Sequence, residues 1–84
     1  MPEISRFYGI VISMFFRQKE HPLPHIHATY AEQVASFNIK TGQLTGGYLR
    51  PTAKKLVEKW LKKNKKALEE MWETQTFKKL PGLE

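Results

Sequence analysis

The feature that most constrains the fold is a change in hydrophobic period at Pro51. Before this residue, apolar side chains alternate with polar ones or form short β-branched and aromatic runs, which is typical of strands. After it, apolar side chains recur in steps of three and four along one stripe from Ala53 to Trp72. The 84 residues are therefore expected to form a single α+β domain. A small antiparallel sheet over residues 4–45 would be packed by one long or broken C-terminal amphipathic helix over residues 51–74.

The sheet is expected to contain three to four strands joined by hairpins. Residues 4–17 are expected to form one long strand, because Ile, Val and Phe are frequent and both alternating faces are apolar. Further strands are expected over His25–Tyr30, over residues 34–39 and, after a turn at Thr41-Gly42, near residues 43–45.

The helix is expected over residues 52–73. Asn64 interrupts the apolar stripe at a point where four lysines crowd together. The helix is therefore either continuous or broken there, with Asn64 capping a second helix that starts at Lys65. Trp60 and Trp72 lie on the stripe and are assigned to packing against the sheet.

The positive charge of the chain is concentrated in the helical half. The net charge is +6, and residues 50–66 alone hold eight basic side chains against Glu58, a net of +7. Such a segment suits a phosphate backbone or an acidic partner protein, and it equally suits a solvated helix face without a ligand. The candidate nucleic-acid or partner-binding residues are Arg50, Lys54, Lys55, Lys59, Lys62, Lys63 and Lys66.

Several classes of protein are excluded by residues that are missing. Cysteine is absent, which excludes disulfides, thiolate zinc sites and cysteine nucleophiles and fits a reducing cytoplasm. Aspartate is also absent, which argues against a magnesium-dependent nuclease. The apolar run over residues 9–16 is too short to span a bilayer, and the first residues do not resemble a signal peptide. We expect a cytoplasmic protein that needs no cofactor and does not contact membranes. Residues 76–84 are expected to fray.

The three histidines fall within seven positions, at His21, His25 and His27. On a strand, His25 and His27 project from the same face, about 6 to 7 Å apart at the backbone. If Ile26 faces the core, both imidazoles must face away from it. The sequence therefore predicts a histidine pair on an exposed face of the sheet.

The histidine pair is compatible with three uses. His25 and His27 could act as acid and base in metal-independent RNA cleavage, with Arg17 or Arg6 holding the phosphate. His21 could join the pair as the third ligand of a metal ion. The imidazoles could instead serve only the structure, by bonding to backbone carbonyls or a tyrosine.

The chain resembles a bacterial family called domain of unknown function 4160. The resemblance is carried by residues 1–12 (MPEISRFYGIVI), residues 21–30 (HPLPHIHATY), Thr41-Gly42 and the helix with Trp60 and Trp72, and it covers residues 1 to 74. The chain departs from the family pattern at Leu23, where a second Pro is common, and at Ser13, where a basic residue is common. Members are short proteins often encoded beside another small protein, which implies a toxin–antitoxin pair or a small regulator.

Together these features lead us to expect a small toxin–antitoxin or regulatory module. It would bind a partner protein and RNA or DNA through the basic helix, and a homo-oligomer is compatible with its size. A metal-independent RNA-cleaving toxin that uses His25 and His27 is the first alternative. A metal-binding module built on His21, His25 and His27 is the second.

Overall fold

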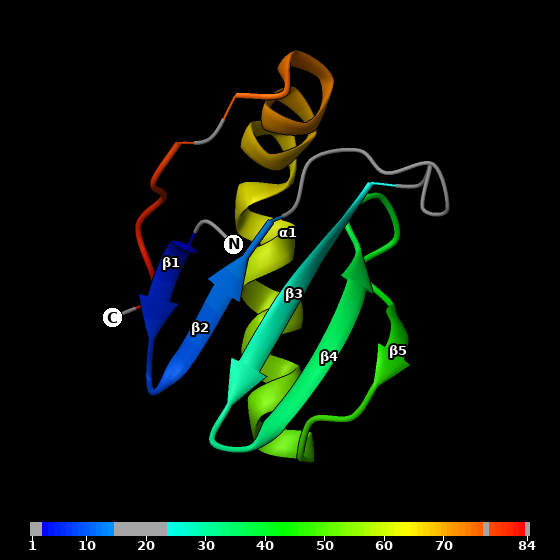
Figure 1. The fold of residues 1–84 in the computed structure, drawn as a ribbon, viewed down its shortest axis with the longest axis vertical. Coiled ribbons are helices and arrows are strands. Elements are labelled where there is room, and N and C mark those ends of the chain that lie inside the picture. The colour runs from blue at the N-terminus through cyan, green and yellow to red at the C-terminus, as the bar shows by residue number, and fades with distance from the viewer. Residues whose placement is uncertain (1–2, 15–23, 77, 84) are drawn as a thin grey trace.

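A five-stranded antiparallel sheet and one long helix make up the fold (Figure 1). The computed structural model describes residues 3–14, 24–76 and 78–83. The elements in chain order are β1 (Glu3–Phe7), β2 (Ile10–Ser13), β3 (His25–Tyr30), β4 (Gln33–Asn38), β5 (Leu44–Gly47) and α1 (Pro51–Thr74). The strands lie in the sheet in the same order as in the chain, so each pairs with its sequence neighbour. The α+β class is confirmed, with five strands in place of the three to four expected.

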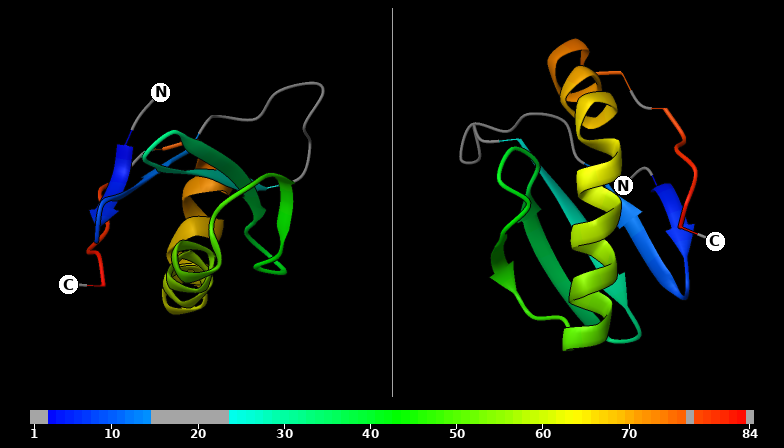
Figure 2. Two further views of the ribbon diagram at one scale, coloured as in Figure 1. Left: turned by 90° about the horizontal axis from the view of Figure 1, so that it is seen from below. Right: turned by 180° about the vertical axis from the view of Figure 1, so that it is seen from behind.

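The helix covers one face of the sheet, and no helix of the described residues lies on the other face (Figure 2). Seen from behind, α1 crosses the strands obliquely, and seen from below, the sheet curves over it. The core between the two layers holds most of the large buried side chains. These include Ile4, Phe7, Ile10, Ile12, Ile26, Phe37, Val57, Trp60, Leu61 and Leu68. The assignment of Trp60 and Trp72 to packing is confirmed, because both are buried.

The expected long strand over residues 4–17 is wrong, because a tight turn at Tyr8 and Gly9 divides it into β1 and β2. Phe7 pairs with Ile10, and the two residues between them have φ angles of 48° and 78°. Positive φ at both central positions is the geometry of a two-residue hairpin with a type I′ turn. Phe7 consequently faces the core beside Ile10, although an unbroken strand would have placed them on opposite faces. Residues 15–17 of the predicted strand lie outside the described residues.

The remaining strands follow the predicted pattern closely. β3 has the expected bounds, and β4 begins at Gln33, one residue before the expected start. β5 extends to Gly47, two residues past the strand expected near residues 43–45. A side chain is excluded at Gly47, because its φ is +73° and an added Cβ would lie 2.2 Å from the Val34 carbonyl oxygen.

The helix is long and kinked rather than broken. It begins at Pro51 and ends at Thr74, and only Asn64 has non-helical angles, with φ −110° and ψ 16°. The Asn64 side-chain amide donates a hydrogen bond of 3.0 Å to the Trp60 carbonyl oxygen, one turn earlier. Because this amide is bonded back into the preceding turn, we assign the residue to the kink and not to the start of a second helix.

The C-terminal tail packs on the rest of the fold. Residues 78–83 are therefore not frayed, although fraying had been expected for residues 76–84. The backbone N–H of Leu80 donates to the Ile4 carbonyl oxygen at 2.7 Å. The indole N–H of Trp60 donates to the Pro81 carbonyl oxygen at 2.9 Å. Leu80 and Leu83 also pack against the core, so the tail lies along β1 (Figure 2).

The close approach of β4 to Gly47 gives a testable difference between two glycines. Gly47→Ala is expected to lower the free energy of unfolding by more than about 2 kcal/mol, because it adds a backbone clash to an unfavourable φ. Gly42→Ala is the matched control, because Gly42 has a φ of +75° and no atom within 4 Å of an added Cβ. Gly42→Ala is expected to lower the free energy of unfolding by only about 1 kcal/mol. If urea denaturation shows that the two variants lose the same free energy of unfolding, the described register of β4 and β5 is contradicted.

Candidate functional surfaces

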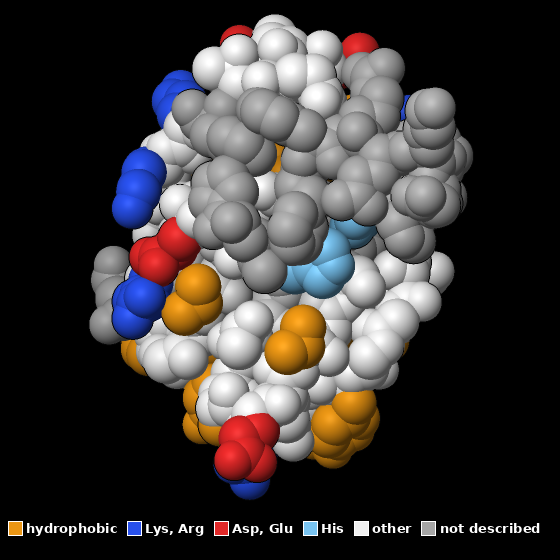
Figure 3. Space-filling model, in the orientation of Figure 1, with side chains coloured by type: hydrophobic (Ala, Val, Ile, Leu, Met, Phe, Trp, Pro, Cys, Tyr) orange, Lys and Arg blue, Asp and Glu red, His pale blue; other side chains and the backbone are white. Residues whose placement is uncertain are grey.

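The register of the sheet gathers polar side chains on the face away from α1. Ser13 of β2 pairs with His27 of β3, which in turn pairs with Ser36 of β4. Directly paired residues point to the same side of a sheet, so these three form one row across the strands. His25 and its partner Asn38 lie on the same face, because Ile26 and Ala28 alternate with the histidines and are buried in the core. Figure 3 shows the histidine side chains on this face.

The two described histidines are close neighbours. Their ring centroids lie 5.2 Å apart, with an edge-to-face angle of 75°. His25, at the first position of β3, also lies 5.6 Å from the ring of Trp72, because the C-terminal turns of α1 extend past this end of the strands (Figure 1). Both histidines are half-buried. The structure thus brings together His25 and His27 as the strand alternation predicts.

Of the other residues proposed for histidine chemistry, the structure describes only Arg6. Arg17 and His21 lie outside the described residues. Arg6 forms an ion pair with Glu3, at 2.8 Å between Nη2 and Oε1. The Arg6 guanidinium donates a hydrogen bond to Glu3, which lowers the pKa of the Glu3 carboxyl below its usual value. Across residues 3–14, 24–76 and 78–83, no group of three or more His, Cys, Asp or Glu side chains could hold a metal ion.

The candidate cations of α1 lie on the opposite side of the protein. Lys55, Lys59, Lys62 and Lys66 are spaced four, three and four residues apart, so they form an outward ridge on successive helical turns. All four are exposed, as are Arg50, Lys63 and Lys65. Lys54 is half-buried and lies 4.0 Å from the Glu58 carboxylate, which makes it the one lysine with an ion pair in the part of α1 that the structure describes.

The histidine face and the lysine ridge therefore do not form a common site. Strand alternation turns Ile26 toward the core and His27 away from it, and the helical stripe turns Trp60 toward the same core and Lys59 away. The core and the sheet separate the two polar surfaces. In Figure 3 the visible Lys and Arg side chains lie toward the margins of the view that holds the histidines.

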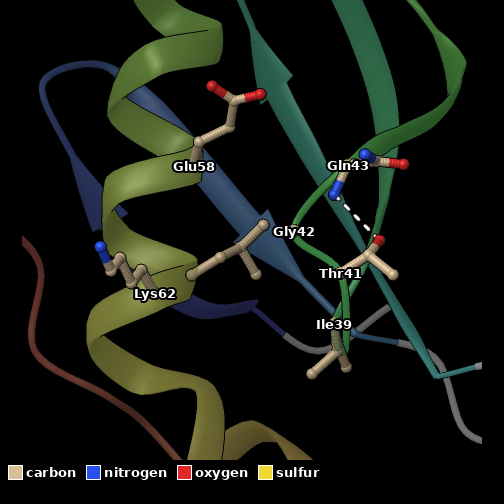
Figure 4. Close-up of a pocket in the computed structure, with 7 residues that line it drawn as sticks. Ile39, Thr41, Gly42, Gln43, Glu58 and Lys62 are labelled. Carbon is tan, nitrogen blue, oxygen red and sulfur yellow. Dashed lines mark hydrogen bonds between the residues drawn. The ribbon is translucent and has the colours of Figure 1, made fainter.

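Surface hollows lie on both flanks of α1. On the side of β4 and β5, a hollow of about 300 Å³ is lined by Glu58 and Lys62 of α1 and by the loop with Thr41 and Gln43. Figure 4 shows the loop with Thr41 and Gln43 beside α1, with the Lys62 ammonium directed away from the loop. Within the loop, the Gln43 backbone N–H donates to the Thr41 hydroxyl at 3.2 Å. Carboxylate and ammonium are both present, so this hollow has no excess charge to select an ion.

The hollow on the side of the β1–β2 turn has a different lining. About 340 Å³ in volume, it is lined by Tyr8, Leu56, Lys59, Lys63 and Leu83. Sequence analysis missed this site, because it placed Tyr8 inside a strand and the C-terminal tail outside the fold. The Tyr8-Gly9 pair was the available signal, since glycine is the residue that most often supplies positive φ at a turn.

The contact of His25 with Trp72 predicts that tryptophan emission depends on this imidazole. His25→Gln is expected to change the emission of the folded protein at constant pH, because the ring that lies 5.6 Å from the indole is lost. In a Trp72→Phe background the same substitution should have no effect on the emission. An unchanged emission in His25→Gln would contradict the described contact.

A comparison with protein-family models gives one match. The model of the family described as "Domain of unknown function (DUF4160)" matches residues 9–73. This agrees with the family and segment suggested by the resemblance. Comparisons with curated proteins and with solved structures give no match. Within the described residues, α1 is not long and apolar enough to cross a membrane, and no other helix is present.

Proposed function

We propose that this chain, which belongs to the DUF4160 family, is a small toxin–antitoxin or regulatory module that binds nucleic acid through α1 and acts with a partner protein. The observation that carries the nucleic-acid part is the outward ridge of Lys55, Lys59, Lys62 and Lys66. The ridge lies on the surface of α1 turned away from the sheet, where a long anionic ligand can reach every ammonium group.

The spacing of the ridge suits a polymer of phosphates. From Lys55 to Lys66 the helix rises about 16 Å, at about 1.5 Å per residue. A point charge on each successive turn can follow a phosphate backbone without reading its bases, which is the usual role of lysine in sequence-independent binding. The first turn of α1 contains no acidic residue, so the helix dipole adds to the positive potential at that end.

The acidic residues of α1 limit the positive surface to its first two-thirds. Glu58 is adjacent to Lys54, and the other three acids, Glu69, Glu70 and Glu73, follow the last lysine. A surface that only kept the protein soluble would need no such separation, because interspersed charges of both signs serve that purpose. The separation therefore supports binding of an anionic partner.

A second candidate function is RNA cleavage without metal. It is supported by the 5.2 Å separation of the His25 and His27 rings and by the hydroxyls of Ser13 and Ser36 in the same row. One imidazole would take a proton from the attacking hydroxyl and the other would give one to the leaving oxygen. The metal-binding alternative depends on His21, which lies outside the described residues.

The proposal predicts salt-dependent binding that depends on the ridge. In fluorescence anisotropy with a labelled oligonucleotide, affinity should fall steeply with added salt. The variant Lys55→Gln, Lys62→Gln, Lys66→Gln should reduce the slope of log K against log salt by about 2 to 3, or about one per lost phosphate contact.

The matched control removes the same charge elsewhere. Lys40→Gln, Lys78→Gln, Lys79→Gln alters three exposed lysines outside α1 and should leave most of the slope intact. Equal weakening by both triple variants would mean that net charge, not the ridge, attracts the ligand. In the same assay, a His25→Ala, His27→Ala variant should bind the oligonucleotide as tightly as the unsubstituted protein. If the unsubstituted protein cleaves RNA and this variant does not, the second candidate function is supported.

A further inference from the structure

The flank of α1 next to the β1–β2 turn combines aromatic and cationic side chains in two adjoining hollows. The 340 Å³ hollow at Lys59 and Lys63 shares Tyr8 and Leu56 with a second hollow of about 170 Å³, which reaches Tyr30 and Arg50. We call the two together the Tyr8 groove, defined by Tyr8, Tyr30, Arg50, Leu56, Lys59 and Lys63. No other hollow described above contains both an exposed aromatic ring and an excess of cations.

The β1–β2 turn holds Tyr8 on the surface. Its side chain is 53% exposed, which is high for a large aromatic residue in a protein of this size. The backbone of Tyr8 is in the left-handed region, with a φ of 48°, where a bulky residue is unusual. The next residue, Gly9, lies against Tyr30, and a Cβ added there would be 3.4 Å from the ring. The turn is therefore packed on Tyr30 while the ring of Tyr8 stays accessible.

The cations border this ring from two directions. Lys59 and Lys63 are one helical turn apart, and both line the hollow with Tyr8 and Leu56. Arg50, just before α1, lines the adjoining hollow with Tyr8 and Tyr30. All three cations are exposed and have no ion pair among the described residues. A largely exposed tyrosine with cations in both of the hollows that it lines matches a ligand that alternates planar rings with negative charges.

We propose that the Tyr8 groove binds single-stranded nucleic acid. A base would stack on Tyr8, the neighbouring phosphates would contact Lys59 and Lys63, and the strand would continue toward Arg50. This inference rests on the proposed function, and it adds that the preferred strand is unpaired. Bases in a duplex are already stacked and cannot lie on a tyrosine ring, whereas single-strand binders combine aromatic platforms with a cationic groove.

The length and the ends of the groove define how much of a strand it holds. Arg50 and Lys63 are about 20 Å apart along the helix, at about 1.5 Å per residue, which is enough for a few nucleotides. Beyond Tyr30 and Arg50 the surface continues into a hollow that includes Glu32. The carboxylate of Glu32 would repel a phosphate, so the bound strand should end near Arg50.

The test compares single strands with a duplex. Labelled oligouridylate and oligodeoxythymidylate of about 12 nucleotides, and a duplex of the same length, are titrated with the full chain at one salt concentration. We expect both single strands to bind more tightly than the duplex.

Substitution of Tyr8 isolates the stacking contact. Tyr8→Asn removes the ring and creates Asn-Gly, the preferred sequence for a type I′ turn, so the hairpin should be at least as stable as before. This variant should bind single strands about tenfold more weakly and the duplex unchanged, whereas Tyr8→Trp should retain binding. A thermal melt of Tyr8→Asn confirms that the fold is intact.

Two lysine pairs give the matched charge control. Lys59→Gln, Lys63→Gln changes the groove, and Lys62→Gln, Lys66→Gln removes the same charge from the part of the ridge outside it. The first pair should weaken single-strand binding more than the second. If the duplex binds as tightly as the single strands, or if Tyr8→Asn binds single strands normally, binding in the Tyr8 groove is contradicted. Binding by the lysine ridge of α1 would remain compatible with either result. Absence of binding to all three nucleic acids would overturn the proposed function as well.

Discussion

The packing of the apolar stripe of α1 on one face of the sheet is the interaction on which the rest of the structure depends. Its centre is the contact of Phe7 with Trp60, whose rings are nearly parallel, at 24°, with centroids 5.8 Å apart. The indole N–H of Trp60 also binds the Pro81 carbonyl, so one side chain joins the sheet, the helix and the tail. Because the sheet and the helix turn their apolar sides to the same core, their polar sides must face opposite directions. The position of every candidate site follows from this.

The separation of the two polar sides limits the functions that this chain can perform alone. A phosphate held by Lys59 or Lys62 on α1 cannot also lie between His25 and His27, because the sheet and core stand between them. The proposed binding by α1 and the proposed histidine chemistry would therefore belong to two separate surfaces.

The sequence was sufficient to predict the features that depend on periodicity. Period-two alternation gave the bounds of β3 and the common face of His25 and His27, and the helical stripe indicated α1 within one residue at each end. The features it did not predict depend on single turns or on distant contacts. Tyrosine is not a residue that signals positive φ, so the turn at Tyr8 was hidden in an apolar run. The tail is held by Ile4 and Trp60, which no local pattern could reveal. The Tyr8 groove requires both features and was therefore missed.

We propose that the helix side of the protein, and not the histidine face, binds nucleic acid. The test is a titration of the isotopically labelled protein with oligouridylate, in which the backbone amide resonances are followed. We expect the largest shifts at Tyr8, Lys59 and Lys63, with His27 and Ser36 on the opposite face unchanged. Shifts concentrated at His27 and Ser36, with α1 unaffected, would contradict this proposal.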